Sequence, residues 1–259
     1  MGTVEELTNV AEVLGVEPDT WLSSVMDRLA LRVVRAHSGV EPSLEESERK
    51  GVFATAKVPT SDVRLSRDLQ ALGFVVIDTA LTFECAEPVA ASRSTARRAT
   101  PEDQQVVGEI AQSAFVFSRF HLDPNIPDGL ANRIKREWVE NFFSGRRGHE
   151  MVVAELDGSV GGFLLLVDGG KGERIIDLIA VAPEFARQGL GQDMIAFTGK
   201  SARESGSMPS KWVVGTQAAN IPSVRLYESV GFRLASSQFV LHYHGRGLDE
   251  LSSLARLKA

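Results

Sequence analysis

The stretch IIDLIAVAPEFARQGLGQ, residues 175–192, decides the fold of this chain. Its first seven residues are apolar except for one aspartate and are mostly β-branched, which predicts a central strand covered on both faces. Pro183 lacks an amide N–H, so the strand should end or bend there. Gly189 and Gly191 let the main chain approach a ligand closely. A helix over residues 190–205 then begins with free amides and a positive dipole end, which attract an anion such as a pyrophosphate.

The two glycines of this turn suit more than one kind of site. An ordinary strand-to-helix connection has the same pattern. A dinucleotide-binding Rossmann turn requires a third glycine three positions after the second, and Met194 stands there. The Rossmann interpretation therefore fails.

A second stretch, TQAANIPSVRLYESVGF at residues 216–232, follows at the next strand and helix. Taken alone, Tyr227 is typical of a half-buried aromatic residue on an amphipathic helix. Together and in this order, the two stretches resemble the GNAT N-acetyltransferase superfamily. The first resembles its acetyl-CoA-binding segment, in which Gln/Arg-x-x-Gly-x-Gly/Ala follows a strand ending in Val-x-Pro. The second resembles the segment in which an asparagine precedes a helix carrying Leu-Tyr-Glu-x-x-Gly-Phe.

The resemblance implies an α/β fold with a mixed sheet, and acetyl-CoA as cosubstrate without a metal. The first position of the acetyl-CoA pattern falls on Ala186 instead of arginine or glutamine, and Arg187 would supply the missing cation. Asn220 would bind the pantetheine arm. The predicted cosubstrate contacts are Ile179, Ala180, Val181, Arg187, Gln188, Gly189, Leu190, Gly191, Gln192 and Asn220.

The implied chemistry passes an acetyl group from a thioester to a neutral amine. A backbone N–H of residues 179–181 would stabilise the charge that develops on the carbonyl oxygen. The phenol of Tyr227 would protonate the departing thiolate. Three proton acceptors stay open: Asp177 on the central strand, His121, and a chain of water molecules. Asp177 equally suits a carboxylate that a neighbouring residue satisfies.

The acceptor is predicted from a narrower resemblance. It is carried by the segments SAF at residues 113–115, SRF at residues 118–120 and WVEN at residues 138–141. With these segments, most of residues 50–244 resembles the dTDP-fucosamine acetyltransferase type, whose members acetylate a nucleotide-linked amino-deoxysugar. Arg119 would then contact a nucleotide phosphate and His121 the substrate. Arg119 equally suits a surface ion pair with Asp123 or Asp128. Two rival functions remain: acetylation of a protein N-terminus or another small amine, and acyl-CoA sensing without catalysis.

Two domains are expected, an N-terminal degenerate GNAT-like domain over residues 1–95 and a complete GNAT domain over residues 96–259. The stretch LQALGF at residues 69–74 mirrors YESVGF at residues 227–232, and each should lead into a two-arm hairpin. Residues 87–96 read as a linker. Strands are predicted over residues 30–36 and 52–58, with a helix capped by Ser61 after them.

Composition excludes several classes of function. The net charge of −6 over 259 residues argues against a nucleic-acid-binding protein. The single cysteine, Cys85, excludes an internal disulfide. No apolar run approaches the ~20 residues that span a bilayer, and the N-terminus lacks a signal-peptide layout. A cytoplasmic protein without membrane contact is expected, and a homodimer is left open. His242 and His244 offer two imidazoles on one strand face, but a zinc site needs three protein ligands.

Overall fold

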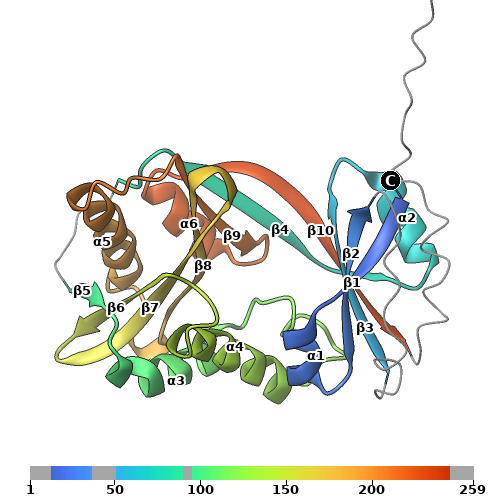
Figure 1. The fold of residues 1–259 in the computed structure, drawn as a ribbon, viewed down its shortest axis with the longest axis horizontal. Coiled ribbons are helices and arrows are strands. Elements are labelled where there is room, and N and C mark those ends of the chain that lie inside the picture. Colours follow the sequence, from blue (N-terminus) through green and yellow to red (C-terminus); the bar gives the residue numbers. More distant parts are fainter. Residues whose placement is uncertain (1–12, 37–50, 90–94, 246–259) are drawn as a thin grey trace, which may run out of the picture. The chain divides into compact units, whose positions relative to one another are not determined.

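The computed structural model describes residues 13–36, 51–89 and 95–245 of the chain (Figure 1). The chain divides into two compact units, which we call unit 1 (residues 1–77 and 239–259) and unit 2 (residues 78–238). Strands β4 (Val75–Cys85) and β10 (Arg233–Gly245) contribute residues to both. These units do not coincide with a boundary at residue 95, and the assignment of two GNAT-like domains stays a prediction.

Among the described residues, unit 1 holds a small sheet and two α-helices. Its strand order is β1-β2-β3-β10, with β1 (Val13–Pro18) antiparallel to β2 (Leu29–Ala36), and β2 parallel to β3 (Val52–Pro59). Helix α1 (Thr20–Met26) lies between β1 and β2, and α2 (Val63–Ala71) follows β3. Both predicted strands are confirmed. The sequence up to about residue 20 predicts weak helical character, which is wrong over residues 13–18, because these form β1.

Two further predictions about unit 1 and its continuation are corrected. The cap of α2 is Asp62, whose Oδ1 accepts a hydrogen bond from the Leu65 amide at 3.0 Å, and not Ser61. The two predicted hairpins are the single strands β4 and β10. Neither strand holds a glycine or proline in its middle, so nothing in the chain stabilises a tight turn there.

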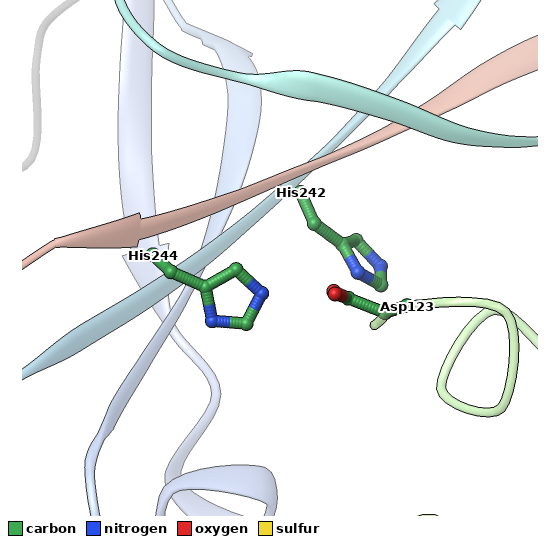
Figure 2. A group of neighbouring side chains, drawn as sticks. All are labelled: Asp123, His242 and His244. Carbon is green, nitrogen blue, oxygen red and sulfur yellow. The ribbon is translucent and has the colours of Figure 1, made fainter. Parts of the chain in front are cut away.

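The two histidines singled out by the sequence lie on β10 in unit 1. Figure 2 shows them with Asp123, which belongs to unit 2. Their ring centroids are 4.8 Å (His242) and 5.2 Å (His244) from the ring of Phe53. Nη1 of Arg28 lies 3.1 Å from Nδ1 of His244. An arginine beside the imidazole works against a bound cation, because like charges repel.

Unit 2 is built on a mixed sheet, as expected. Its strand order is β10-β4-β9-β8-β7-β6-β5, and every pairing recorded from β4 to β5 is antiparallel except the parallel pair β8–β9. The remaining strands are β5 (Ala96–Arg98), β6 (Glu150–Leu156), β7 (Ser159–Asp168), β8 (Glu173–Val181) and β9 (Lys211–Gln217). β6 and β7 are joined at Asp157 and Gly158, which both have positive φ, as a tight hairpin turn requires.

Helices cover both faces of this sheet (Figure 1). On one face, α3 (Gln104–Ala114) and α4 (Asp128–Phe143) pack on Phe163 and Leu165. On the other face, α5 (Leu190–Glu204) and α6 (Ile221–Ser229) pack on Leu164 and Leu166. Successive side chains of β7 point to opposite faces of the sheet, so this strand contributes to the hydrophobic core on each face. Among the described helices, none is long and apolar enough to cross a membrane.

Candidate active site

Strands β8 and β9 stop pairing with each other before either strand ends. They pair only from Glu173 with Lys211 to Ile176 with Val214, although β8 continues to Val181 and β9 to Gln217. A β-bulge lies at the point of separation, because Leu165 pairs with Leu178 and Leu166 with Ile176, which leaves Asp177 as the extra residue. Bulges commonly lie beside active sites, where they redirect a side chain.

A cavity of about 930 Å³ lies beside the separated strands, within unit 2. Its wall combines residues 176–181 of β8, the start of α5, the ends of β9 and α6, and residues 114–118. Eleven of the twelve predicted catalytic and cosubstrate residues line it: Asp177, Ile179, Ala180, Val181, Arg187, Gly189, Leu190, Gly191, Gln192, Asn220 and Tyr227. Gln188, Arg119 and His121 are not in this wall.

The leading turn of α5 has the backbone that an anion site requires. Gly189 caps the helix with φ +87°, and Arg187 also has a left-handed φ of 63°. The first amide that bonds back into the helix is that of Asp193, 3.0 Å from the Gly189 carbonyl oxygen. The amides of Leu190, Gly191 and Gln192 precede it and have no acceptor within the helix. They can therefore donate to a phosphate.

The second glycine of the motif has a different role from the one expected. Gly191 has no positive φ, and a Cβ there would lie 3.1 Å from Cδ2 of Leu226 on α6. Its lack of a side chain serves close packing of the two helices. The Nε2 of Gln192 donates to Ser229 Oγ at 3.1 Å, which fixes the same contact.

Two glycines on β7 were missed by the sequence reasoning. A Cβ on Gly161 would lie 2.6 Å from Phe185 and 2.8 Å from Leu190, and one on Gly162 would lie 2.9 Å from the Ala180 carbonyl oxygen. The turn before α5 can therefore rest directly on the sheet. The adjacent Gly-Gly pair in an otherwise apolar strand was the available signal, since glycine in a strand marks a close approach.

Tyr227 and Asn220 are held by helix α6. The Oδ1 of Asn220 caps the helix by accepting from the Ser223 amide at 3.2 Å. Tyr227 is only 2% exposed and packs against Phe83 and Phe232, and its hydroxyl lies beside the side chain of Ser223. Burial raises the pKa of the Tyr227 phenol well above its usual range. The phenol stays protonated at neutral pH, as a general acid must.

Asp177 is held by three donors. Arg147 binds it with both nitrogens of its fork, Nη2 to Oδ1 at 2.6 Å and Nε to Oδ2 at 2.7 Å, and the Trp138 indole donates to Oδ2 at 3.0 Å. Both oxygens of this carboxylate are thus occupied by donors. The geometry favours the interpretation of Asp177 as a carboxylate satisfied by its neighbours.

His121 and Arg119 lie apart from the large cavity wall. His121 Nδ1 is 2.6 Å from Ser118 Oγ, and Nε2 is 2.8 Å from Asn132 Oδ1. It lines a smaller cavity of about 340 Å³, which shares Phe115 and Val116 with the larger one. The guanidinium of Arg119 lies 4.6 Å from the ring centroid of Phe120.

One wall residue that the sequence reasoning did not select is Lys135 on α4. It is 7% exposed, which is unusual for a lysine. In the sequence, Leu130, Ile134, Trp138 and Phe142 recur at helical spacing and predict an apolar face that does not include Lys135. In the structure, the buried residues of the helix include Ala131, Ile134, Lys135 and Val139.

Comparisons with known proteins agree with the two motifs. Residues 116–232 match the sequence model of the acetyltransferase (GNAT) family. A curated relative, the spore coat polysaccharide biosynthesis protein SpsD of Bacillus subtilis (strain 168), is 32% identical over 143 residues. That match covers 55% of this chain and 48% of the relative, so it spans about half of that protein.

Solved structures share the fold at low identity. A GCN5-related N-acetyltransferase from Sphaerobacter thermophilus matches with a TM-score of 0.59 and 13% identity over 90% of this chain and 77% of that one. A GCN5-related N-acetyltransferase from Kribbella flavida matches with a TM-score of 0.56 and 14% identity, over 96% of this chain and 91% of that one. A tandem GNAT protein from the clavulanic acid biosynthesis pathway matches with a TM-score of 0.52 and 13% identity, over 83% of this chain and 75% of that one. At these identities the likeness shows the fold alone.

Proposed function

Residues 116–232 of this chain belong to the acetyltransferase (GNAT) family, and from this premise we propose that the chain transfers an acetyl group from acetyl-CoA to the amine of a small acceptor. GNAT acetyltransferases use acetyl-CoA as cosubstrate. The acceptor we propose is a nucleotide-linked amino-deoxysugar.

One observation carries this proposal. The cavity of about 930 Å³ brings the leading turn of α5, the unpaired end of β8 and Tyr227 of α6 into one wall. Its size is in the range of ligand pockets, about 300–1,000 Å³. The amides of Leu190, Gly191 and Gln192 suit a pyrophosphate, and the edge of β8 suits the extended arm of the cosubstrate. The residues therefore fit the coenzyme.

The chemistry follows from these groups. An amide of residues 179–181 donates to the thioester carbonyl oxygen, where negative charge develops. Tyr227 gives its proton to the departing sulfur. Asp177 holds Arg147 and the Trp138 indole in place by three hydrogen bonds, so we assign it a positioning role.

The acceptor class has separate support. The matched relative is, by its name, a spore coat polysaccharide biosynthesis protein, which agrees with a sugar acceptor. The smaller cavity is lined by polar groups that can bind hydroxyls, namely Gln112, Ser113, His121, Asp128 and Asn132. Because it shares Phe115 and Val116 with the larger cavity, an acceptor there would lie next to the cosubstrate.

Thiol release tests the proposal. The purified chain is incubated with acetyl-CoA and, in separate reactions, with amino-sugar nucleotides, free amino sugars, polyamines and short peptides. We expect the highest kcat/KM with an amino-sugar nucleotide. Preference for a peptide N-terminus would replace the proposed acceptor. Tight binding of acetyl-CoA in calorimetry without turnover of any amine would identify an acyl-CoA sensor instead.

A further inference from the structure

The amine of Lys135 is a buried group that the proposed function leaves without a role. Its Nζ lies 4.6 Å from the ring centroid of Phe115 and 4.8 Å from that of Trp138. Among the described residues, these two rings are the contacts recorded for this nitrogen. A lysine is seldom buried unless its amine is paired or has a function.

The charged groups that face Lys135 come from three elements. Arg119 lies in the loop before α4, Arg147 follows α4, and Asp177 lies on β8. The two arginines lower the pKa of Lys135 and the aspartate raises it, but burial is the largest cause. The pKa falls from 10.5 to about 7. At neutral pH a large share of these amines is neutral and carries a free lone pair.

The two side chains among the three proton acceptors that the sequence left open are already engaged. Asp177 accepts three hydrogen bonds, two of them from Arg147. Both ring nitrogens of His121 have partners, Ser118 and Asn132. Lys135 instead lines the cavity wall that also holds Tyr227, and it lies on the rigid helix α4.

We propose, on the premise of the proposed function, that the neutral amine of Lys135 is the base that removes a proton from the acceptor ammonium. The acceptor then has the lone pair that it needs for attack. This assigns a catalytic residue that neither sequence motif contains.

The protons and bonds balance in this scheme. The acceptor ammonium gives one proton to Lys135, which passes it to solvent. The acceptor nitrogen forms a bond to the acetyl carbon, and the carbon–sulfur bond breaks. Sulfur takes a proton from Tyr227, and the phenolate regains one from the nitrogen that has formed the amide. One proton is released per turnover, and no oxidant or reductant is needed.

Kinetics of two variants test the proposal with the full chain. Lys135→Met keeps the length of the side chain and removes the amine, and Lys135→Arg keeps the charge but cannot become neutral. With the best acceptor from the thiol-release panel, we expect both to lower kcat/KM about 10²–10⁴-fold at pH 7. Wild-type kcat/KM should rise with pH through a midpoint near 7, and this midpoint should disappear in both variants.

The controls separate chemistry from binding and folding. Both variants should bind acetyl-CoA as wild type does in calorimetry, and Lys135→Met should not melt earlier, because it no longer buries a charge. Lys200→Met on α5 is the matched control. Lys200 is exposed, pairs with Glu204, and lies outside the cavity wall, so its loss should leave kcat/KM unchanged.

A measurement independent of activity follows the amine itself. In protein carrying ¹³C-labelled lysine, the Lys135 signal is the one absent from Lys135→Met, and we expect its titration midpoint near 7. A midpoint near the ordinary ~10.4 would overturn the proposal. Full activity in Lys135→Arg would show that the group acts as a cation, and stable acetylation of Lys135 seen by mass spectrometry would show an acceptor instead of a base.

Failure of this inference and failure of the proposed function look different. Normal turnover by Lys135→Met beside an active wild type would overturn the role of Lys135 alone. No turnover by wild type with any amine would overturn the proposed function and this inference together.

Discussion

Replacing Tyr227 with phenylalanine should separate catalysis from folding. The ring remains packed between Phe83 and Phe232, whose centroids lie 5.9 and 6.1 Å away. The polar contact of the hydroxyl with the Ser223 side chain is lost, which costs at most about 1 kcal/mol of unfolding free energy. For a chain of this size that lowers Tm by about 2–4 °C. Loss of a general acid should instead lower kcat about 10²–10⁴-fold, equivalent to about 3–5 kcal/mol of activation free energy.

The assay measures thiol release at saturating acetyl-CoA and acceptor, with calorimetry for acetyl-CoA affinity. We expect affinity to stay within about twofold of wild type, because the hydroxyl acts only as the bond breaks. Ser223→Ala is the control: it removes the partner of the phenol and keeps the phenol. A Tyr227→Phe enzyme with kcat close to wild type would refute the reasoning, since the sulfur would then receive its proton from another group.

Three further substitutions, the first with a matched control, test the structure of unit 2. Gly189→Ala places a Cβ on a residue with φ +87°. This should cost about 1–2 kcal/mol of unfolding free energy and weaken acetyl-CoA binding about tenfold in calorimetry. Gly206→Ala is the matched control, because Gly206 has φ +67° and a Cβ there would meet no atom within 4 Å. It should lower the unfolding free energy but leave the affinity for acetyl-CoA unchanged. Asp177→Asn weakens the contact with half-exposed Arg147 and should lower the unfolding free energy by about 1 kcal/mol in urea titrations; a loss of activity above about 100-fold would restore Asp177 as the base. Asp103→Asn removes a carboxylate whose pKa an arginine hydrogen bond holds below its ordinary value. That stabilisation is present above about pH 4 and is lost as pH falls through the folded-state pKa. The variant should therefore melt below wild type at pH 7, and the difference in Tm should shrink at acidic pH. An equal difference in Tm at pH 7 and below pH 3 would contradict this reasoning.

The sequence predicted the elements whose structure depends on a short continuous segment. The apolar run at residues 175–181 is β8, and the helix expected at residues 190–205 is α5 (Leu190–Glu204). The hairpins failed because strand continuation depends on a neighbouring strand. β4 continues because residues 80–85 pair with β9, and the paired residues lie 127 to 137 positions apart in the chain.

In the candidate site too, the sequence predicted the features held in one segment and missed those that depend on distant residues. The anion-binding turn and the capped helix of Tyr227 are each contained in one short segment, so the sequence could place them. The bulge at Asp177 depends on the register between β7 and β8, which no single strand specifies. Lys135 could not be found because a lysine on a helix is normally exposed, and its burial results from packing against Phe115 and Trp138.

The similarity between residues 69–74 and 227–232 extends to the geometry of the two helices. Equivalent positions are 158 residues apart throughout. Asp62 accepts from the Leu65 amide at 3.0 Å, and Asn220 accepts from the Ser223 amide at 3.2 Å. The two helices therefore begin with the same side-chain cap at equivalent positions.

Both helices also end in the same way. Gly73 and Gly231 have φ of +94° and +95°. The Phe74 amide then donates to the Leu69 carbonyl oxygen at 3.1 Å, as the Phe232 amide does to the carbonyl oxygen of residue 227 at 3.0 Å. Agreement of cap, turn and strand entry supports the proposal that the N-terminal part is a degenerate copy.

The copy differs where the chemistry lies. Leu69 occupies the position of Tyr227 and is equally buried, so the packing is kept but the proton donor is absent. No Gly-x-Gly turn precedes α2 in the sequence, so the anion site has no counterpart there. Because both the acid and the pyrophosphate contacts are needed for transfer, we propose that the N-terminal copy serves structure or the acceptor, and that acetyl transfer belongs to unit 2.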